Sequence, residues 1–324
     1  MTIRLGLIGC GEHSESGHAV PLARYRAAHP DQIELSAACD IQPGRAQRFC
    51  HKYGFSRSYA DVDEMLAREK FDGCIAVVPT ESIAELGIKL LRLRMPCVVE
   101  KPLGGSIEKV KPLVDAARET LTPNMVSVNR RFMPFLHDAV KWTRAVGPLR
   151  YVRATLLRHA RSESDFLWTT AVHAVDALRH VAGEVATAEM RTLGEGSAGW
   201  YGIDLQFENG VAGHIDVLPT AGILEESYEL VGEGFRARVT APFGLQRSWR
   251  GFRDNELQEE EVASKTMPED VLNGCYGEAT EFIRSLNSKD APHPSIEEVF
   301  PSVKLCLDLA NTQKTNPTKH GKGS

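Results

Sequence analysis

The stretch IRLGLIGCGEHSESGH, which runs from Ile3 to His18, decides the fold of this chain. It opens with a short apolar run that predicts a buried strand, and it breaks at Gly9 and Gly11 before a segment that can start a helix. Gly9 suits a tight bend, Gly11 lets backbone approach a pyrophosphate, and the helix directs its first N–H groups at the phosphates. Ser14 takes the place of the third glycine, where a small residue still allows close packing. The pattern predicts a dinucleotide-binding turn; the alternative is a plain strand–turn–helix.

A second apolar run, residues 33–39, ends in Asp40. An acid at the tip of the second strand can accept hydrogen bonds from both ribose hydroxyls of an adenosine and would repel a 2′-phosphate, so Asp40 favours NAD over NADP. Arg45 lies close to Asp40 in the sequence, and its positive charge makes the preference for NAD over NADP less definite. The acid follows the glycines by more than the usual spacing of about 20 residues, which predicts a long loop in the first crossover. The alternative for Asp40 is a solvated turn acid.

Length and composition fit a two-domain globular protein. The chain has 324 residues and a net charge of −5, which allows a large core and gives no sign of a nucleic-acid partner. No apolar run has the length of a membrane span, and the chain starts a strand without a basic and then apolar leader, so we expect a cytoplasmic protein. Four of the seven cysteines, Cys10, Cys39, Cys74 and Cys97, lie in or beside predicted buried strands. They are interpreted as small core residues, not as a disulfide framework or a zinc site.

Two regions differ in their pattern of secondary structure. Residues 1–128 alternate predicted strands with helices, which indicates a parallel sheet covered on both faces. One of these helices has a start signal at Asp61 and Glu64, the pattern of a capping box. In residues 129–312 the strands cluster, and Asn209-Gly210 between two alternating runs predicts a hairpin.

The second region is therefore predicted to be an open, mostly antiparallel sheet with helices on one face. Its last helix, residues 295–311, opens with the capping box Ser295-Ile296-Glu297-Glu298. Because an open sheet face must be covered, we expect the other face to form the surface of a homodimer or homotetramer. The polar tail, residues 313–324, is expected to fray.

The tripeptide Glu100-Lys101-Pro102 follows a predicted parallel strand. Open α/β sheets bind their ligands at this carboxyl edge. A lysine there can hydrogen-bond a substrate hydroxyl and stabilise the alkoxide that forms as its hydrogen leaves as hydride. The alternative is a surface lysine.

A helix is predicted from Thr169 to Val181. On it Thr169, His173, Asp176 and His180 fall on one face. A histidine with an aspartate three residues later suits general acid–base chemistry, since the carboxylate can orient the imidazole or raise its basicity. The alternative is a His–Asp pair on the helix surface. We predict no metal site, because no Cys or Glu cluster completes a ligand set.

At this point the chain resembles the family of glucose–fructose oxidoreductase, inositol dehydrogenase and the rhizopine-catabolism oxidoreductases, nearly from end to end. The segments that carry the resemblance are GLIGCGEHS with His18 downstream, Asp40, EKP at 100–102, NRRFMP at 129–134, HAVD at 173–176, FENGV at 207–211, YGEATEFI and PSIEEV. The resemblance implies an N-terminal Rossmann domain and a C-terminal α/β domain with a large open sheet on which oligomers form. It also implies hydride transfer between a nicotinamide and the carbinol of a sugar or cyclitol.

Carried onto this sequence, the resemblance assigns three groups of residues. The catalytic group is Lys101 as the contact of the reacting hydroxyl, His173 as the acid–base, and Asp176 as a substrate or orienting contact. The cofactor-binding group is Gly9, Gly11, Glu12, His13, Asp40, Pro79, Thr80, Glu100 and Lys101. The substrate group is Asn129, Arg131, Trp168 and Thr169.

Some positions depart from the pattern of the family. Similar proteins usually carry an Asp four residues before the histidine and a Gly two before it, where this chain has Thr169 and Ala171. The usual Pro-Asn turn after the fourth strand is Pro79-Thr80, and the usual histidine beyond it is Ile83. Ahead of His173 lie three further residues, Arg158, Arg161 and Trp168, that either select an acidic or phosphorylated sugar or form a solvated loop.

The sequence thus predicts an NAD-dependent dehydrogenase or ketoreductase of a sugar, a sugar derivative or a cyclitol. Two alternatives stay open. One is a hydrolase or lyase of the same family that uses tightly held NAD only transiently. The other is a non-catalytic regulator that senses a nucleotide and acts by binding a protein, since no DNA-reading element is present.

Overall fold

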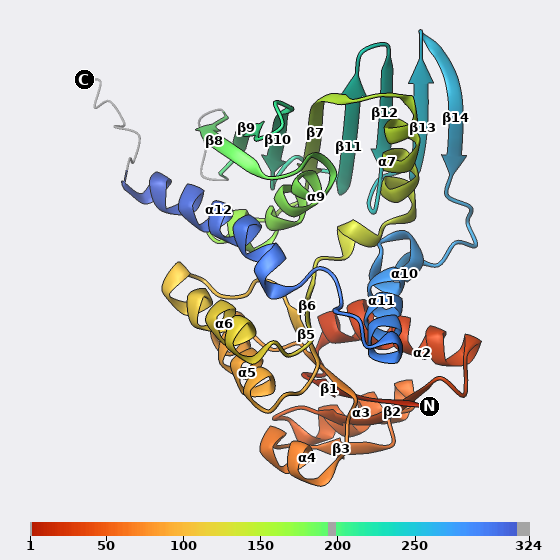
Figure 1. Cartoon of the computed structure of the whole chain (residues 1–324), viewed down its shortest axis with the longest axis vertical. Coiled ribbons are helices and arrows are strands. Elements are labelled where there is room, and N and C mark those ends of the chain that lie inside the picture. The colour runs from red at the N-terminus through yellow and green to blue at the C-terminus, as the bar shows by residue number, and fades with distance from the viewer. Residues whose placement is uncertain (1, 194–198, 316–324) are drawn as a thin grey trace.

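The computed structural model describes residues 2–193 and 199–315, and these form two sheets that lie one above the other in Figure 1. The first sheet has six strands in the order β3-β2-β1-β4-β5-β6, and all of its pairs are parallel. Its strands are β1 (Ile3–Ile8), β2 (Ile33–Cys39), β3 (Arg57–Tyr59), β4 (Gly73–Ala76), β5 (Cys97–Glu100) and β6 (Asn124–Ser127). Its helical segments are α1 (Glu12–Ser14), the π-helical turn η1 (Glu15–Ala19), α2 (Val20–Ala28), α3 (Pro43–Tyr53), α4 (Val62–Arg68), α5 (Thr80–Arg92) and α6 (Ile107–Thr120). The predicted parallel sheet is confirmed.

Local sequence explains these elements. The strands are nearly continuous apolar runs because helices cover both faces, and Leu5 and Leu7 in β1 are fully buried. The predicted start of α4 is confirmed, since the Asp61 carboxylate accepts a hydrogen bond from the backbone N–H of Glu64 at 2.7 Å. The strand order reverses between β1 and β4, so the crevice at their carboxyl ends is where a doubly wound sheet binds ligands.

The first crossover differs from its prediction. We expected a long loop between the glycines and Asp40, but residues 12–28 are helical throughout. The extra residues are therefore in helix, and the π-helical turn Glu15–Ala19 lies within this stretch, between α1 and α2. A single π turn accommodates an added residue inside a helix, and such turns are frequent at functional sites.

The second sheet has eight strands in the order β14-β13-β12-β11-β7-β10-β9-β8, and only the β7–β10 pair is parallel. Its strands are β7 (Leu149–Leu157), β8 (Val185–Thr192), β9 (Tyr201–Phe207), β10 (Ala212–Leu218), β11 (Glu225–Gly232), β12 (Phe235–Thr240), β13 (Ser248–Arg253) and β14 (Glu256–Val262). The other elements of this region are the 3-10 turn η2 (Asn129–Phe132), α7 (Pro134–Val146), α8 (Phe166–Thr169), α9 (Val172–Ala182), α10 (Glu269–Leu272), α11 (Cys275–Ser288) and α12 (Ile296–Thr315). The hairpin predicted at Asn209-Gly210 is confirmed as the antiparallel pair β9–β10.

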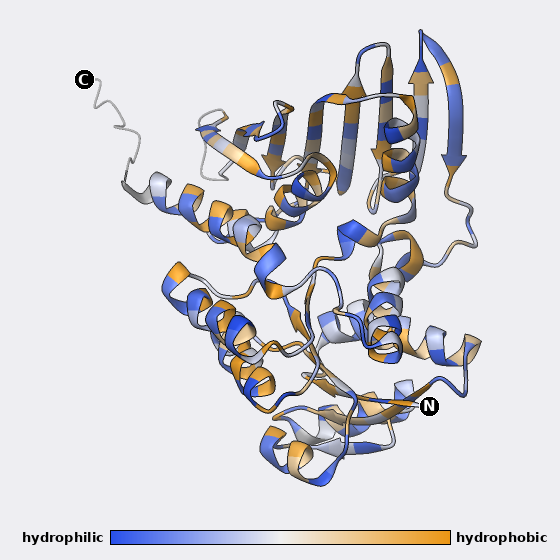
Figure 2. Cartoon of the chain, viewed as in Figure 1, coloured by the Kyte–Doolittle hydropathy of each residue, from blue (hydrophilic) through white to orange (hydrophobic). Residues whose placement is uncertain are grey.

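Helices cover one face of the second sheet, as predicted. Val152, Ala154 and Leu156 of β7 are fully buried on the side of α7 and α9, whereas the alternate residues Tyr151 and Arg153 reach the opposite face. Figure 2 shows this alternation as mixed colours along the strands, with a largely hydrophilic edge strand β14.

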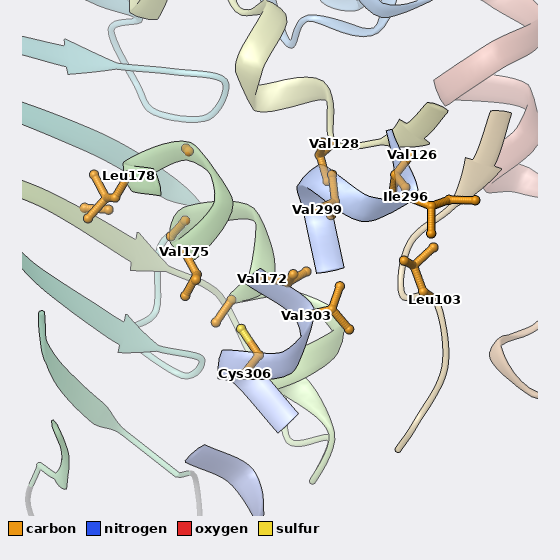
Figure 3. Packing of buried hydrophobic residues seen from close by; sticks show 14 of the residues in the cluster. Leu103, Val126, Val128, Val172, Val175, Leu178, Ile296, Val299, Val303 and Cys306 are labelled. Atoms are coloured by element: carbon orange, nitrogen blue, oxygen red, sulfur yellow. The ribbon is translucent and has the colours of Figure 1, made fainter. Parts of the chain in front are cut away.

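Helix α12 joins the two sheets. Its capping box is confirmed, because the backbone N–H of Glu298 donates to Ser295 Oγ at 3.3 Å and that of Ser295 donates to Glu298 Oε2 at 2.6 Å. Figure 3 shows apolar residues of α12, such as Val303, packing in one cluster with Val172 of α9 and Val126 of β6. The helix continues to Thr315, and the rest of the expected tail, 316–324, lies outside the described residues.

Sequence order does not decide which sheet a helix covers. Phe282 and Ile283 of α11 belong to the same buried cluster as Leu5 and Leu7 of β1, although α11 follows the whole second sheet in the chain. The division at residues 128 and 129 therefore does not describe α11, which packs on the first sheet. No helix in the described part of the chain is both long and apolar enough to cross a lipid bilayer.

Candidate functional site

The glycine turn leaves open space where the sequence predicts phosphates. Gly9 has φ +94°, and a Cβ there would lie 1.8 Å from the carbonyl oxygen of Val77, so no other residue fits. A Cβ at Gly11 would meet nothing within 4 Å, which leaves the approach to the start of the helical segment clear. Ser14 is buried as expected, but its hydroxyl has no hydrogen-bond partner among the described residues.

A cavity of about 500 Å³ continues from this turn along the carboxyl edge of the first sheet. Its lining includes Gly9, Gly11, Asp40 and Pro79, four residues of the predicted cofactor group. Its walls are largely apolar, as the face of an adenine ring requires, and Thr80 begins α5 beside it. Glu12 lines a neighbouring cavity with Arg45 and Arg48. The residues at this edge therefore fit a dinucleotide.

Asp40 holds the two turns that flank this cavity. Its Oδ2 accepts a hydrogen bond from the backbone N–H of Cys10 at 2.9 Å, and its Oδ1 accepts one from that of Gln42 at 2.8 Å. Arg45 Nη1 lies 3.5 Å from Oδ2. Asp40 is thus a buried residue with backbone partners, so the alternative of a freely solvated turn acid does not describe it.

Glu100, the last residue of β5, pairs with two histidines. Its Oε1 lies 2.9 Å from His13 Nε2 and 2.9 Å from His18 Nε2, while its Oε2 is buried without a partner among the described residues. Burial opposes the ionisation of Glu100, but the charge and hydrogen bond of His13, with the hydrogen bond of His18, hold the pKa of this carboxyl well below its usual range. The charge of Glu100 in turn raises the pKa of His13.

The π turn explains why two histidines reach one oxygen. His13 and His18 are five residues apart, and residues at that spacing would point in different directions on a regular α-helix. The turn η1 between them closes i→i+5 hydrogen bonds, which brings the two side chains to the same side. No role for His18 was predicted, and its five-residue spacing from His13 is the signal for this pairing.

Lys101 lies beside the second sheet's helices. Its Nζ donates to the backbone carbonyl of Thr169 at 3.1 Å. Burial lowers the pKa of Lys101, the adjacent Glu100 opposes that shift, and the charges of Arg130, Arg161 and Arg158 reinforce it. The hydrogen-bond partner of the Lys101 ammonium is thus a neutral carbonyl.

A break in the predicted helix makes this contact possible. We expected one helix from Thr169 to Val181, but the structure has α8, which ends at Thr169, and α9, which begins at Val172. The end of a helix leaves carbonyls without intrahelical partners, and that of Thr169 accepts the Lys101 ammonium. The Thr169 hydroxyl instead turns back to the carbonyl of Asp165 at 2.9 Å.

His173 is buried beside this contact and is not paired with Asp176. Its Nδ1 has no partner among the described residues. Burial, followed by the charges of Arg130, Lys101 and Arg158, holds the pKa of His173 well below its usual range. The imidazole is therefore neutral at neutral pH, which is the state that accepts a proton.

Asp176 has other partners, which corrects the expected His–Asp pair. Arg131 donates to both of its oxygens, from Nε at 2.7 Å and from Nη2 at 2.8 Å, and Ser302 Oγ donates to Oδ1 at 2.8 Å. The same contacts correct the expectation that Arg131 binds substrate, since its guanidinium is committed to Asp176. Residues three apart on a helix share a face, but a guanidinium from η2 forms the better bidentate pair.

Two other predicted substrate residues, Asn129 and Trp168, lie in different surroundings. Asn129 Nδ2 donates to the carbonyl of Asn273 at 2.8 Å, so Asn129 holds the approach of η2 to α11 and does not face the site. Trp168 packs over Gly105, where a Cβ would lie 3.4 Å from its ring, close to the Lys101 loop. The sequence analysis missed Arg130 and Glu226, which are buried and hydrogen-bonded at 2.9 Å; only the unusual pair of adjacent arginines in NRRF signals them. The described residues contain no His, Cys, Asp or Glu group suited to a metal.

Known proteins are similar to this chain in sequence and in fold. Residues 3–129 match the family model described as "Oxidoreductase family, NAD-binding Rossmann fold". A 4-carboxy-2-hydroxymuconate-6-semialdehyde dehydrogenase of a Sphingobium species is 25% identical, over 95% of this chain and 98% of its own length. An inositol 2-dehydrogenase of Saccharopolyspora erythraea is 26% identical, over 78% of this chain and 77% of its own.

Among solved structures, a dehydrogenase from Chromobacterium violaceum superposes with a TM-score of 0.85 at 17% identity, covering 97% of this chain and 96% of that one. That likeness establishes the two-sheet fold. The family model covers the glycine turn and the residues that line its cavity. Residues 3–129 therefore form an NAD-binding Rossmann domain of the Gfo/Idh/MocA oxidoreductase family.

Proposed function

We propose that this chain transfers a hydride between NAD(H) and the hydroxyl or keto carbon of a sugar, a sugar derivative or a cyclitol. The observation that carries the proposal is the contact of Lys101 Nζ with the Thr169 carbonyl, four residues before His173, at the edge where the dinucleotide cavity lies. The names of the relatives, an inositol dehydrogenase and a semialdehyde dehydrogenase, support a substrate with a hydroxyl or carbonyl group.

A nicotinamide dinucleotide held in the cavity that Gly9, Gly11 and Asp40 line would supply the hydride acceptor or donor for the carbinol carbon. His173, which is buried and neutral, takes the hydroxyl proton through a ring nitrogen. Lys101 then stabilises the developing alkoxide with its ammonium charge, which burial strengthens because it weakens screening by water. Asp176 acts at a distance, through the position of Arg131 and of α9, and not as a direct partner of the base.

Substitution of Lys101 by methionine tests the proposal. A panel of polyols, sugars and cyclitols is first screened for NADH formation, and the best substrate is then used for kinetics. We expect Lys101→Met to lower kcat by at least about 100-fold, the size of a lost acid–base or electrostatic contact. Its affinity for NAD, measured by calorimetry, should stay within about twofold of the wild type, since Lys101 lies outside the cavity that Asp40 lines.

Lys111→Met, an exposed lysine of α6, is the matched control and should leave both quantities unchanged. Turnover by Lys101→Met at the wild-type rate would contradict the catalytic role of Lys101. Product without net NADH would favour the hydrolase or lyase alternative, and nucleotide binding without any turnover would favour the regulator.

A further inference from the structure

Two buried arginines share one carboxylate next to this site. Arg130 donates to both oxygens of Glu226, from Nε at 2.9 Å and from Nη2 at 3.0 Å, and Arg158 Nη2 donates to Oε2 at 2.6 Å. Tyr228 adds its hydroxyl at 2.5 Å. The three charged side chains are at most 8% exposed. Two guanidinium charges against one carboxylate leave this buried cluster with a positive charge in excess.

Among the described residues, no second carboxylate pairs with these two arginines; their further acceptors are neutral, namely Asn129 Oδ1 and the backbone carbonyls of Leu157 and Glu225. The ring of Phe243 lies against both guanidiniums, with its centroid 5.6 Å from Arg130 and 5.1 Å from Arg158, but a cation–π contact only partly replaces a counter-charge. The Nε–H of Arg158 donates to no acceptor in the described parts of the chain. Because unpaired buried charge is strongly unfavourable, such a cluster is suited to an anion that arrives with a ligand.

Arg161, which is ion-paired with Glu163, places a third guanidinium near Lys101. Its guanidinium lies 5.4 Å from the centroid of Phe166 and its Nε donates to Glu163 at 2.5 Å, which holds the side chain but leaves both terminal nitrogens without acceptors among residues 2–193 and 199–315. Phe166 begins α8, and α8 ends at the Thr169 carbonyl that binds Lys101. Arg161 is 42% exposed, so a ligand can reach it.

The nearby carboxylates are already committed. Glu100 is hydrogen-bonded to His13 and His18, Asp176 to Arg131 and Ser302, and Glu163 to Arg161 through its Nε alone. The excess charge reaches the reacting groups: after burial, the charges of Arg130 and Arg158 are among the causes that lower the pKa of both Lys101 and His173.

We infer that the substrate of this site carries a carboxylate, which Arg161 binds through its free terminal nitrogens while Arg130 and Arg158 supply the balancing positive charge. The inference rests on the proposed hydride transfer and narrows its substrate to an acidic hydroxy or oxo compound, such as a uronic or aldonic acid. A planar guanidinium matches the two oxygens of a carboxylate. The buried arginine pair thus forms part of the substrate site, in place of the solvated loop.

Calorimetry on the NADH-saturated protein tests the inference without turnover. The probes are two matched pairs, D-glucuronate with D-glucose and L-tartrate with erythritol. We expect the acid of each pair to bind at least about tenfold more tightly than its neutral partner, and added NaCl to weaken that preference. Arg161→Gln should lower acid affinity about tenfold. Arg284→Gln, a similarly exposed arginine of α11 paired with Glu281, should leave it unchanged.

Equal binding of acid and neutral probes, or equal behaviour of Arg161→Gln and Arg284→Gln, overturns the inference. The same probes are assayed for NADH formation after saturation with NAD. If the neutral compounds are oxidised and the acids do not bind, the inference of a carboxylate on the substrate is wrong, whereas the proposed hydride transfer is supported. Tight, Arg161-dependent binding of acids with no NADH from any compound contradicts the hydride transfer and leaves the anion site standing. Absence of acid binding overturns the inference whatever the turnover.

Discussion

Glu100 and Lys101 are neighbours in the sequence but serve different sides of the site. Successive side chains at a strand end point in opposite directions. Glu100 faces the helical segment after the glycine turn and binds His13 and His18, while Lys101 faces Thr169 in the second region. The carboxylate that could have neutralised the lysine is therefore held by histidines. This separation keeps the lysine available for an oxygen of the substrate.

The pH dependence of turnover follows from the shifted groups. Oxidation needs His173 neutral and Lys101 charged, and the pKa of each is lowered in the fold. On the acid side, we expect kcat/KM for oxidation to decrease only below about pH 6.5, the ordinary pKa of histidine. On the alkaline side, we expect the decrease to have an apparent pKa below about 10.4, the ordinary pKa of lysine. Arg161→Gln should move the alkaline limb upward, because one of the charges that lower the Lys101 pKa is lost. An acid limb at or above pH 6.5 in the wild type would contradict the role of His173.

Cofactor choice depends on one carboxylate. We propose that NAD is preferred, because Asp40 at the end of β2 lines the cavity and would repel a 2′-phosphate. Asp40→Ala should weaken NAD binding. It should also reduce the ratio of the affinity for NAD to the affinity for NADP, since Arg45 loses its carboxylate partner. Fluorescence titration with NAD, NADH, NADP and NADPH measures this. A wild type that binds NADP as tightly as NAD would show that Arg45 outweighs Asp40.

At the scale of the element, helix α11 brings an acid into the core beneath the site. Glu278 is buried, and Ser127 Oγ of β6 donates to its Oε1 at 2.7 Å. Burial, and then the charge of Glu100, raises the pKa of Glu278 well above its usual range, so the fold favours the protonated form of this carboxyl. The π turn η1 and helix α11 thus set the protonation of two neighbouring acids in opposite directions.

Glu278→Gln should therefore stabilise the protein at alkaline pH. A carboxyl whose folded pKa is raised contributes stability below its unfolded pKa and loses it as pH rises toward the folded value, by up to about 1.4 kcal/mol per pH unit. The neutral glutamine has no such loss, so its free energy of unfolding should exceed that of the wild type by a margin that grows from pH 5 to pH 8. Urea unfolding at several pH values measures the margin. A difference that is constant with pH, as we expect for the exposed control Glu119→Gln, would show that Glu278 is ionised in the fold.

At the scale of the whole molecule, the open face of the second sheet is the surface on which we expect oligomers. Leu157 of β7 and Leu218 of β10 are paired in register and half-buried on that face, beside the Arg153–Asp216 ion pair. Such a mixed face gains from burial against a second copy. Light scattering should give a multiple of 35.7 kDa, and Leu157→Arg should shift it toward the single chain. Leu93→Arg, on an exposed residue of the first domain, should not. A wild type that stays a single chain at tens of micromolar would exclude this surface.

The sequence by itself determined most of the helices and strands, and the edge of the first sheet at which the candidate site lies. Apolar runs, glycines and capping residues act over a few positions, so the turn at Gly9, the parallel sheet and the place of Lys101 at a strand end could all be derived locally. The break between α8 and α9 and the π turn could not be derived locally. The helical periodicity of the sequence continues through both, and only packing against neighbouring elements interrupts the regular helix.

Only the tertiary structure decided the partners of the charged residues. Asp176 pairs with Arg131, 45 residues earlier, and Arg130 pairs with Glu226, 96 residues later. His173 is left without the aspartate that shares its helix face. The physical reason is that a buried charge takes the partner with the best geometry in space, and that geometry exists only once η2, α9 and β11 have packed together. The sequence therefore placed Lys101 and the glycine turn at one edge of the first sheet, whereas the pairing of the charged residues around them came from the fold.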